Sequence, residues 1–172
     1  MLKHKHNDRQ TGFTLIEVMI TILVGGIVLA VGLPSFADFT KSNRLAAQTN
    51  SVLTALHLAR SEAVNRGHNM RVLPIAATTD WAQGWQVRLD VNNDDTTDAE
   101  DTVLRNYDAI KKATLVGDAD NVTYQSSGFI TTTSANTITL TASECTAEDI
   151  RVISVKLSGL VSSARQACPP PP

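Results

Sequence analysis

The sequence has few of the residues, and none of the motifs, from which catalytic sites are usually built. It contains four histidines and two cysteines among 172 residues. It has no nucleophile elbow, no Cys and His spacing typical of zinc sites and no phosphate-binding loop. His4 and His6 lie in the basic N-terminal stretch, whereas His57 and His68 lie within and just after an expected helix. We therefore expect neither an enzyme nor a cofactor.

An excess of positive charge is also missing. The chain has 15 Lys and Arg against 17 Asp and Glu, a formal net charge of −2. A mildly acidic protein is not an obvious nucleic-acid binder on charge alone. No internal repeat is visible, and the roughly one hundred residues beyond the N-terminal region suit a single globular domain.

What the sequence does contain is a long apolar run, from Phe13 to Leu33. As a helix it would cover about 31 Å, enough to span a bilayer core. Three basic residues precede it, Lys3, Lys5 and Arg9. Positive charge before an apolar run keeps that end in the cytoplasm, so everything after it should lie outside the inner membrane. A plain signal anchor and a secretory signal peptide cut after Ala37 are the competing interpretations.

One carboxylate interrupts this run, at Glu17. A charged side chain inside a membrane helix costs on the order of 3 kcal/mol, so it is expected to have a partner. The natural partner is the amino group that would be created by cutting between Gly12 and Phe13. The motif that joins these features is Gly12-Phe13-Thr14-Leu15-Ile16-Glu17.

This motif resembles the N-terminus of type IV pilins and pseudopilins. The resemblance implies that a prepilin peptidase cleaves after Gly12 and methylates Phe13. It also implies that Glu17 guides assembly into a filament. Residues 1–12 would then be a leader peptide, and 13–33 a transmembrane segment.

The helical pattern continues through residues 34–66 as an amphipathic segment. Apolar positions spaced by seven, four, three and four residues fall on one face, at Leu45, Val52, Leu56, Ala59 and Ala63. Gly67 follows at a plausible C-cap position. One long helix is therefore expected to begin in the membrane and to end packed on the domain that follows.

After Gly67 the apolar pattern changes to a period of two. β-branched and Thr-rich segments divided by Gly, Asn and Asp are typical of antiparallel sheets. We expect strands around residues 70–73, 85–89, 103–107, 115–116, 122–124, 129–130, 138–140 and 152–157. The predicted fold is α+β: a long N-terminal helix on an antiparallel β-rich domain of two small sheets, residues 67–172.

Several later segments resemble the H-type pseudopilins and the FimT/FimU minor pilins. They are Leu58-Ala59-Arg60-Ser61-Glu62-Ala63, Trp81, Gly84-Trp85, Asp90 and Val103-Leu104-Arg105. The resemblance implies a structural subunit that primes or caps a type IV pilus or a type II secretion pseudopilus. Its partners would be other pilins or pseudopilins, the prepilin peptidase and the inner membrane. The C-terminal domain would be periplasmic, and later lie in a filament or at its tip.

Both cysteines, Cys145 and Cys168, fall in the expected periplasmic part. An oxidising compartment and an even count favour a disulfide between them. Four prolines, from Pro169 to Pro172, end the chain as an exposed tail.

An acidic stretch from Asp90 to Asp101 superficially follows a calcium loop. Asp90, Asn92, Asp94 and Asp101 occupy four of the ligand positions of an EF-hand. Asp95 replaces the required glycine, and an aspartate ends the stretch in place of a glutamate. A solvated hairpin loop is the favoured interpretation, and a weak calcium site is the alternative.

DNA uptake is an alternative function. Some FimT-type minor pilins bind DNA through a C-terminal motif of glycine, arginine, any residue and arginine. The corresponding stretch here is Gly159-Leu160-Val161-Ser162, which lacks both arginines. Lys156 and Arg165 lie nearby, but binding to phosphates needs several such contacts. DNA is therefore a possible partner that the residues do not favour.

Overall fold

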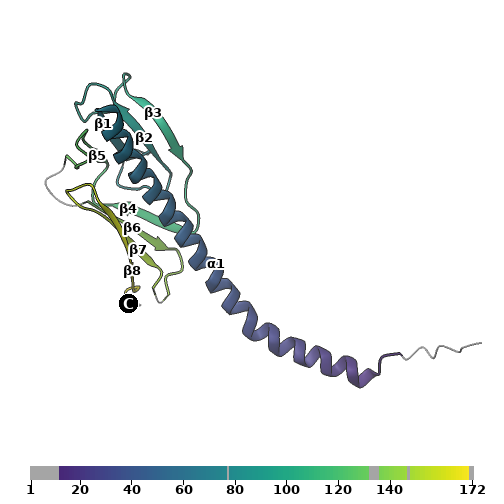
Figure 1. The fold of residues 1–172 in the computed structure, drawn as a ribbon. Helices are drawn as coiled ribbons and strands as arrows, with labels where there is room; N and C mark the ends of the chain where they lie inside the picture. Colours follow the sequence, from purple (N-terminus) through teal and green to yellow (C-terminus); the bar gives the residue numbers. More distant parts are fainter. Residues whose placement is uncertain (1–11, 77, 132–135, 147, 171–172) are drawn as a thin grey trace, which may run out of the picture. The chain divides into compact units, whose positions relative to one another are not determined.

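The computed structural model describes residues 12–76, 78–131, 136–146 and 148–170. The chain divides into two compact units, one ending at Lys41 and the other beginning at Ser42. A single helix, α1 (Leu15–Arg66), supplies the regular structure of the first unit and the first element of the second (Figure 1). Eight strands follow it along the chain.

In the first unit, α1 is apolar and uncovered. Its large apolar side chains between Leu15 and Leu33 are all exposed. Among the described residues, α1 is the one helix long and apolar enough to cross a membrane, with a mean hydropathy of 2.5 over its most apolar window. Pro34 lies within the helix and does not end it, as is common in membrane helices. The boundaries expected for the leader, 1–12, and for the membrane segment stay predictions, and residues 1–11 lie outside the described part.

In the second unit, α1 buries one face. The buried residues are Leu45, Thr49, Val52, Ala55, Leu56, Ala59 and Ala63. They include all five positions of the predicted apolar face. Thr49 can join them because its hydroxyl donates to the Leu45 carbonyl at 2.8 Å, which satisfies the polar group within the helix.

The helix stops at Gly67, as its sequence predicts. The Gly67 N–H donates to the Ala63 carbonyl at 3.0 Å, and its φ is +70°. This left-handed conformation costs glycine little and turns the chain away from the helix axis.

The first sheet has the strand order β3-β2-β1-β5 and is antiparallel throughout. Its strands are β1 (Asn69–Pro74), β2 (Trp85–Asp90), β3 (Thr102–Tyr107) and β5 (Val122–Tyr124). A register shift between Val87 and Arg88 bends the pairing of β2 with β3. In β2 the residues Trp85 and Val87 are buried while Gln86 and Arg88 are half-buried, as expected. The alternation ends there, because Leu89 is only half-buried and Asp90 is buried.

The second sheet has the order β4-β6-β7-β8 and is also antiparallel. Its strands are β4 (Ala113–Gly117), β6 (Asn136–Ala142), β7 (Ile150–Val155) and β8 (Val161–Gln166). Side chains from both sheets and from the buried face of α1 form one continuous apolar core. The α+β fold with two small antiparallel sheets is therefore confirmed.

One expected strand was wrong, and a second has different bounds from those expected. Phe129 and Ile130 form no strand. A turn comes just before them, in which the Gly128 N–H donates to the Gln125 carbonyl, and Ile130 forms an isolated bridge with Tyr124. The strand expected over 152–157 ends at Val155 instead. A turn follows it, in which the Gly159 N–H donates to the Lys156 carbonyl at 2.8 Å. That turn leads into β8, which the sequence did not predict.

Candidate processing and assembly site

The N-terminal segment presents an accessible peptide bond just before the helix. Gly12 and Phe13 precede α1, and the Phe13 side chain is 83% exposed. An exposed segment outside regular structure is the kind of backbone that a peptidase can bind in extended form. The predicted cleavage point therefore lies where the structure is open to an enzyme.

Thr14 caps the helix. The Glu17 N–H donates to the Thr14 hydroxyl at 3.2 Å, and the Val18 N–H donates to the Thr14 carbonyl at the same distance. A threonine three residues before a glutamate is the capping-box pattern, which satisfies backbone donors that the first turn leaves unpaired. The cap fixes the start of α1 two residues after the predicted cleavage point.

Glu17 lies in this first turn and is exposed. A carboxylate there interacts favourably with the positive end of the helix dipole. It can also accept a charge-assisted hydrogen bond from an ammonium group. The geometry thus provides an anionic group one turn from the place where a new N-terminus would arise.

The structure contains the disulfide that the sequence predicts, between Cys145 and Cys168. Their Cα atoms are 5.8 Å apart. Cys145 follows β6 and Cys168 follows β8, the edge strand of the second sheet. The bond therefore ties the chain after the edge strand to the loop between β6 and β7.

The acidic stretch is the loop between β2 and β3. The carboxylate of Asp90 is buried and accepts hydrogen bonds from the backbone N–H groups of Asp94 and Asp95, at 3.3 and 3.0 Å. Asn92 donates to the carboxylates of Asp94 and Asp98. In the described part of the chain, no group of three or more His, Cys, Asp or Glu side chains is arranged to hold a metal ion.

Hydrogen bonds, burial and neighbouring charges shift the pKa values of two aspartates in this loop. The Thr96 backbone N–H and hydroxyl bind the Asp94 carboxylate and lower its pKa. Burial raises the pKa of Asp95, and the charge of Asp90 adds to the effect. Asp101, the fourth candidate calcium ligand, lies 3.9 Å from the Arg88 guanidinium, so its carboxylate is already paired with a cationic side chain. The arrangement is that of a hydrogen-bonded hairpin loop.

The two cations considered for DNA do not form a cluster. Lys156 begins the turn between β7 and β8, whereas Arg165 lies near the far end of β8, paired with Arg151. Four residues of strand, or roughly 13 Å, separate Val161 from Arg165. The turn between β7 and β8 is tightly packed against the neighbouring turn, since a Cβ on Gly159 would lie 2.0 Å from the Gly128 carbonyl oxygen. Arg60 of α1 donates to the carbonyls of Gly128 and Ser158 and fixes both turns.

The family model described as type II transport protein GspH matches residues 48–159 of the chain. This match covers more than half of the sequence. The chain belongs to the GspH family. A second model, the prokaryotic N-terminal methylation motif, matches residues 7–33 and so includes Gly12, Phe13 and Glu17.

One solved structure shares the fold of this chain, and curated type IV major pilins match short parts of it. The type IV minor pilin FimU of Pseudomonas aeruginosa superposes with a TM-score of 0.60 at 20% identity, over 72% of this chain and 90% of that one, and so shares its fold. The type IV major pilin protein PilA of Myxococcus xanthus is 42% identical over 57 residues. PilE1 of Neisseria gonorrhoeae is 56% identical over 34 residues. The matches span 25% and 21% of the lengths of those pilins, and 33% and 20% of this chain. The predicted resemblance to H-type pseudopilins and FimT/FimU minor pilins is confirmed.

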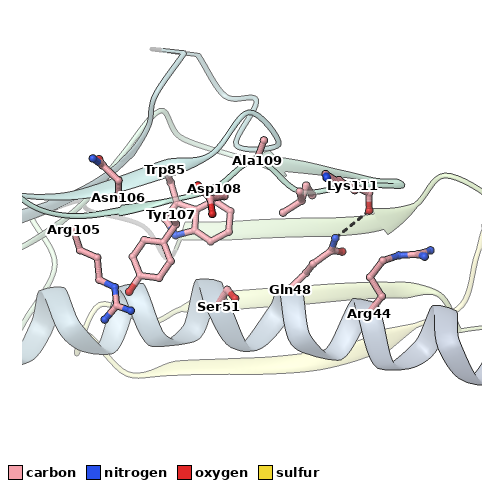
Figure 2. A pocket seen from close by; sticks show the side chains of 11 residues that line it. Arg44, Gln48, Ser51, Trp85, Arg105, Asn106, Tyr107, Asp108, Ala109 and Lys111 are labelled. Carbon is pink, nitrogen blue, oxygen red and sulfur yellow. Dashed lines mark hydrogen bonds between the residues drawn. The ribbon is translucent and has the colours of Figure 1, made fainter.

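Sequence reasoning missed one feature of this GspH-family chain, a pocket in the second unit beside α1 (Figure 2). Trp85, Arg105 and Tyr107 stood out only as parts of motifs or strands. Their meeting depends on the pairing of Trp85 with Tyr107 across β2 and β3. No local sequence pattern predicts which residue of β3 lies opposite Trp85, so the pocket could not be predicted from the sequence.

Proposed function

We propose that this protein is a minor subunit of a pilin-type filament, cleaved after Gly12, methylated at Phe13 and assembled through the exposed apolar part of α1. In this proposal it is anchored in the inner membrane by one helix, with its β-rich domain on the periplasmic side. It primes or caps a type IV pilus or a type II secretion pseudopilus. Membership of the GspH family supports the class of subunit.

The observation that carries the proposal is a single carboxylate in an uncovered apolar helix. Glu17 is the one charged residue between Phe13 and Ala37, and the large apolar side chains around it are exposed. Such a surface is stable only in lipid or against other apolar helices. A free amino group at Phe13 of a neighbouring subunit would neutralise the carboxylate in either setting.

Substitution of Glu17 tests this pairing. Glu17→Gln should leave the amount of protein in the membrane fraction unchanged, because the change removes a charge from the bilayer. It should lower the amount recovered in sheared filaments several-fold. Asp38→Asn is the matched control, since it makes the same chemical change on the same helix beyond the apolar run. Normal recovery of the Glu17→Gln variant in filaments would refute the pairing.

The proposed role in priming filament assembly predicts a second, separate result. Deletion of the gene should reduce the number of filaments per cell while leaving the length of the remaining ones unchanged. Complementation should restore the number. Surface pili and secreted enzymes are measured in the same strains, because loss of one or the other assigns the filament type. Fewer and shorter filaments together would point to a role along the shaft instead.

A further inference from the structure

A pocket of about 510 Å³ lies in the second unit, between α1 and the region where β2 begins and β3 ends. Arg44, Gln48 and Ser51 line it from α1, and Trp85 and Tyr107 from the two strands. The connection from β3 to β4 closes it, where the Lys111 carbonyl accepts a hydrogen bond from the Gln48 side-chain amide at 3.0 Å. Figure 2 shows this bond and the aromatic pair facing the helix.

The aromatic wall of the pocket is rigid. The rings of Trp85 and Tyr107 stack with centroids 5.4 Å apart and planes inclined by 10°. The Arg105 guanidinium lies over the Tyr107 ring, 5.2 Å from its centroid. Trp85 is only 1% exposed, whereas Arg105 is exposed. The wall is thus preformed, and one exposed cation lies over it.

Four polar atoms of the residues that line this pocket are buried without a hydrogen-bond partner among the described residues. They are Arg44 Nε, Gln48 Oε1, Trp85 Nε1 and the Tyr107 hydroxyl. Most buried polar atoms in proteins are paired, so four unpaired ones around a single cavity call for an explanation. Burial also raises the pKa of Tyr107, which keeps its hydroxyl protonated as a donor.

The chemistry of these groups defines what fits. Three of the four atoms are donors, and Gln48 Oε1 is an acceptor. Arg44, Arg105 and Lys111 line the pocket against one acid, Asp108, so the charge of the lining residues is positive. A matching group carries a carboxylate and also a hydrogen-bond donor nearby. An acidic side chain with its own backbone N–H has both, whereas a phosphodiester has no donor for Gln48.

We infer that this pocket binds an acidic side chain, with the adjoining backbone, from a neighbouring subunit of the filament. The inference rests on the proposed role as a filament subunit, which supplies the partner. In the complex, Arg105, which lies over the Tyr107 ring, binds the carboxylate beside the aromatic pair. The Trp85 and Tyr107 donors and the Gln48 acceptor then gain the partners that they lack. The pocket would give the subunit a preferred neighbour, in addition to the general contacts of apolar helices.

The two tryptophans of the chain provide a test with an internal control. The Trp81 indole N–H donates to the Ala119 carbonyl at 3.4 Å, whereas that of Trp85 has no partner in the described part of the chain. Full-length ¹⁵N-labelled protein in detergent micelles is titrated with a capped alanine peptide that carries one central glutamate. The Trp85 indole resonance should shift and saturate, and the Trp81 resonance should stay. The same peptide with glutamine in place of glutamate should cause no shift.

Variants then locate the site. Arg105→Gln should weaken the peptide affinity by about tenfold, as expected when a charge-assisted hydrogen bond is lost. Arg165→Gln, a cation on the edge strand outside the pocket, should leave the affinity unchanged. Melting curves of each variant show that the fold is retained. Because this titration needs no filament, it can succeed or fail independently of the Glu17 experiment.

Three outcomes would overturn the inference. One is an unmoved Trp85 resonance with the glutamate peptide. A second is an equal shift with the glutamine peptide or with inorganic phosphate, because the site would then not select an acidic side chain. The third is tighter binding of a short single-stranded oligonucleotide, which would make the pocket a nucleic-acid site.

Discussion

The two parts of helix α1 are continuous in sequence but bury their side chains in opposite ways. Between Leu15 and Leu33 the helix is apolar on all sides and its large side chains are exposed. Between Leu45 and Ala63 seven residues on one face are buried, and most others are polar or half-buried. A helix that is apolar all round requires an apolar environment, whereas a one-sided helix requires only a sheet to cover one face. The two parts of this one helix therefore require different environments.

This difference separates the proposed role of α1 in assembly from its role in folding. The core of the second unit consists of residues from Leu45 onward, and no residue of the apolar run belongs to it. Burial of a Leu or Val side chain stabilises a fold by about 1.5–3 kcal/mol. The apolar run contributes none of this to the β-rich unit, so its composition is free to serve the membrane insertion and helix packing that we propose.

The largest expected effect is a contrast between two leucines of this helix. Leu56→Ala should lower the free energy of unfolding of the β-rich unit by about 2–5 kcal/mol, because it leaves a cavity in the core. Leu29→Ala should leave that free energy unchanged. Chemical denaturation of the full-length protein in detergent, followed by near-UV circular dichroism of Trp81 and Trp85, measures both. Equal losses from the two variants would contradict the separation.

The disulfide should have the next largest effect, also confined to the second unit. Cys145→Ser should lower the free energy of unfolding by about 3 kcal/mol in the chain-entropy model, given a sequence separation of 23 residues. Cys168→Ser should cost a similar amount, and the double variant should add little. Thermal melting with and without reductant gives the same comparison in the unmodified chain. A double variant that loses the sum of the two single effects would show that the cysteines act separately.

Tyr124 gives the smallest effect, visible only at high pH. Burial raises the pKa of its phenol above the value of about 10 expected in the unfolded chain. Above that pH the unfolded state releases its proton first, so the free energy of unfolding falls as pH rises. Tyr124→Phe should flatten this decrease and change stability little at neutral pH, since the hydroxyl has no hydrogen-bond partner among the described residues. Parallel pH curves for the two proteins would contradict the assignment.

The fold was largely predictable because its main elements carry strong periodicity. The face of α1 follows from Leu45, Val52 and Leu56, and the alternation of Trp85, Val87 and Leu89 predicts β2. Strand β8 escaped prediction because it is an exposed edge strand, where Ser162, Ser163 and Arg165 give no apolar alternation.

The sites divide in the same way. The N-terminal motif is contiguous, so Gly12, Phe13 and Glu17 could be chosen from sequence. The disulfide required only a count of cysteines and an expected compartment. The pocket could not be predicted, because Arg44 and Tyr107 are far apart in the chain and meet only through packing of the helix on the strands.

Mass spectrometry of the mature N-terminus tests the central claim most directly. The protein is purified from the membrane of its native host, and its N-terminal peptide is sequenced. We predict a chain that begins with N-methylated Phe13, because the methylation motif covers this position and the backbone before the helix is exposed. A chain that begins at Asp38 would indicate an ordinary secretory signal, and it would contradict the account of α1 as an anchor and assembly helix.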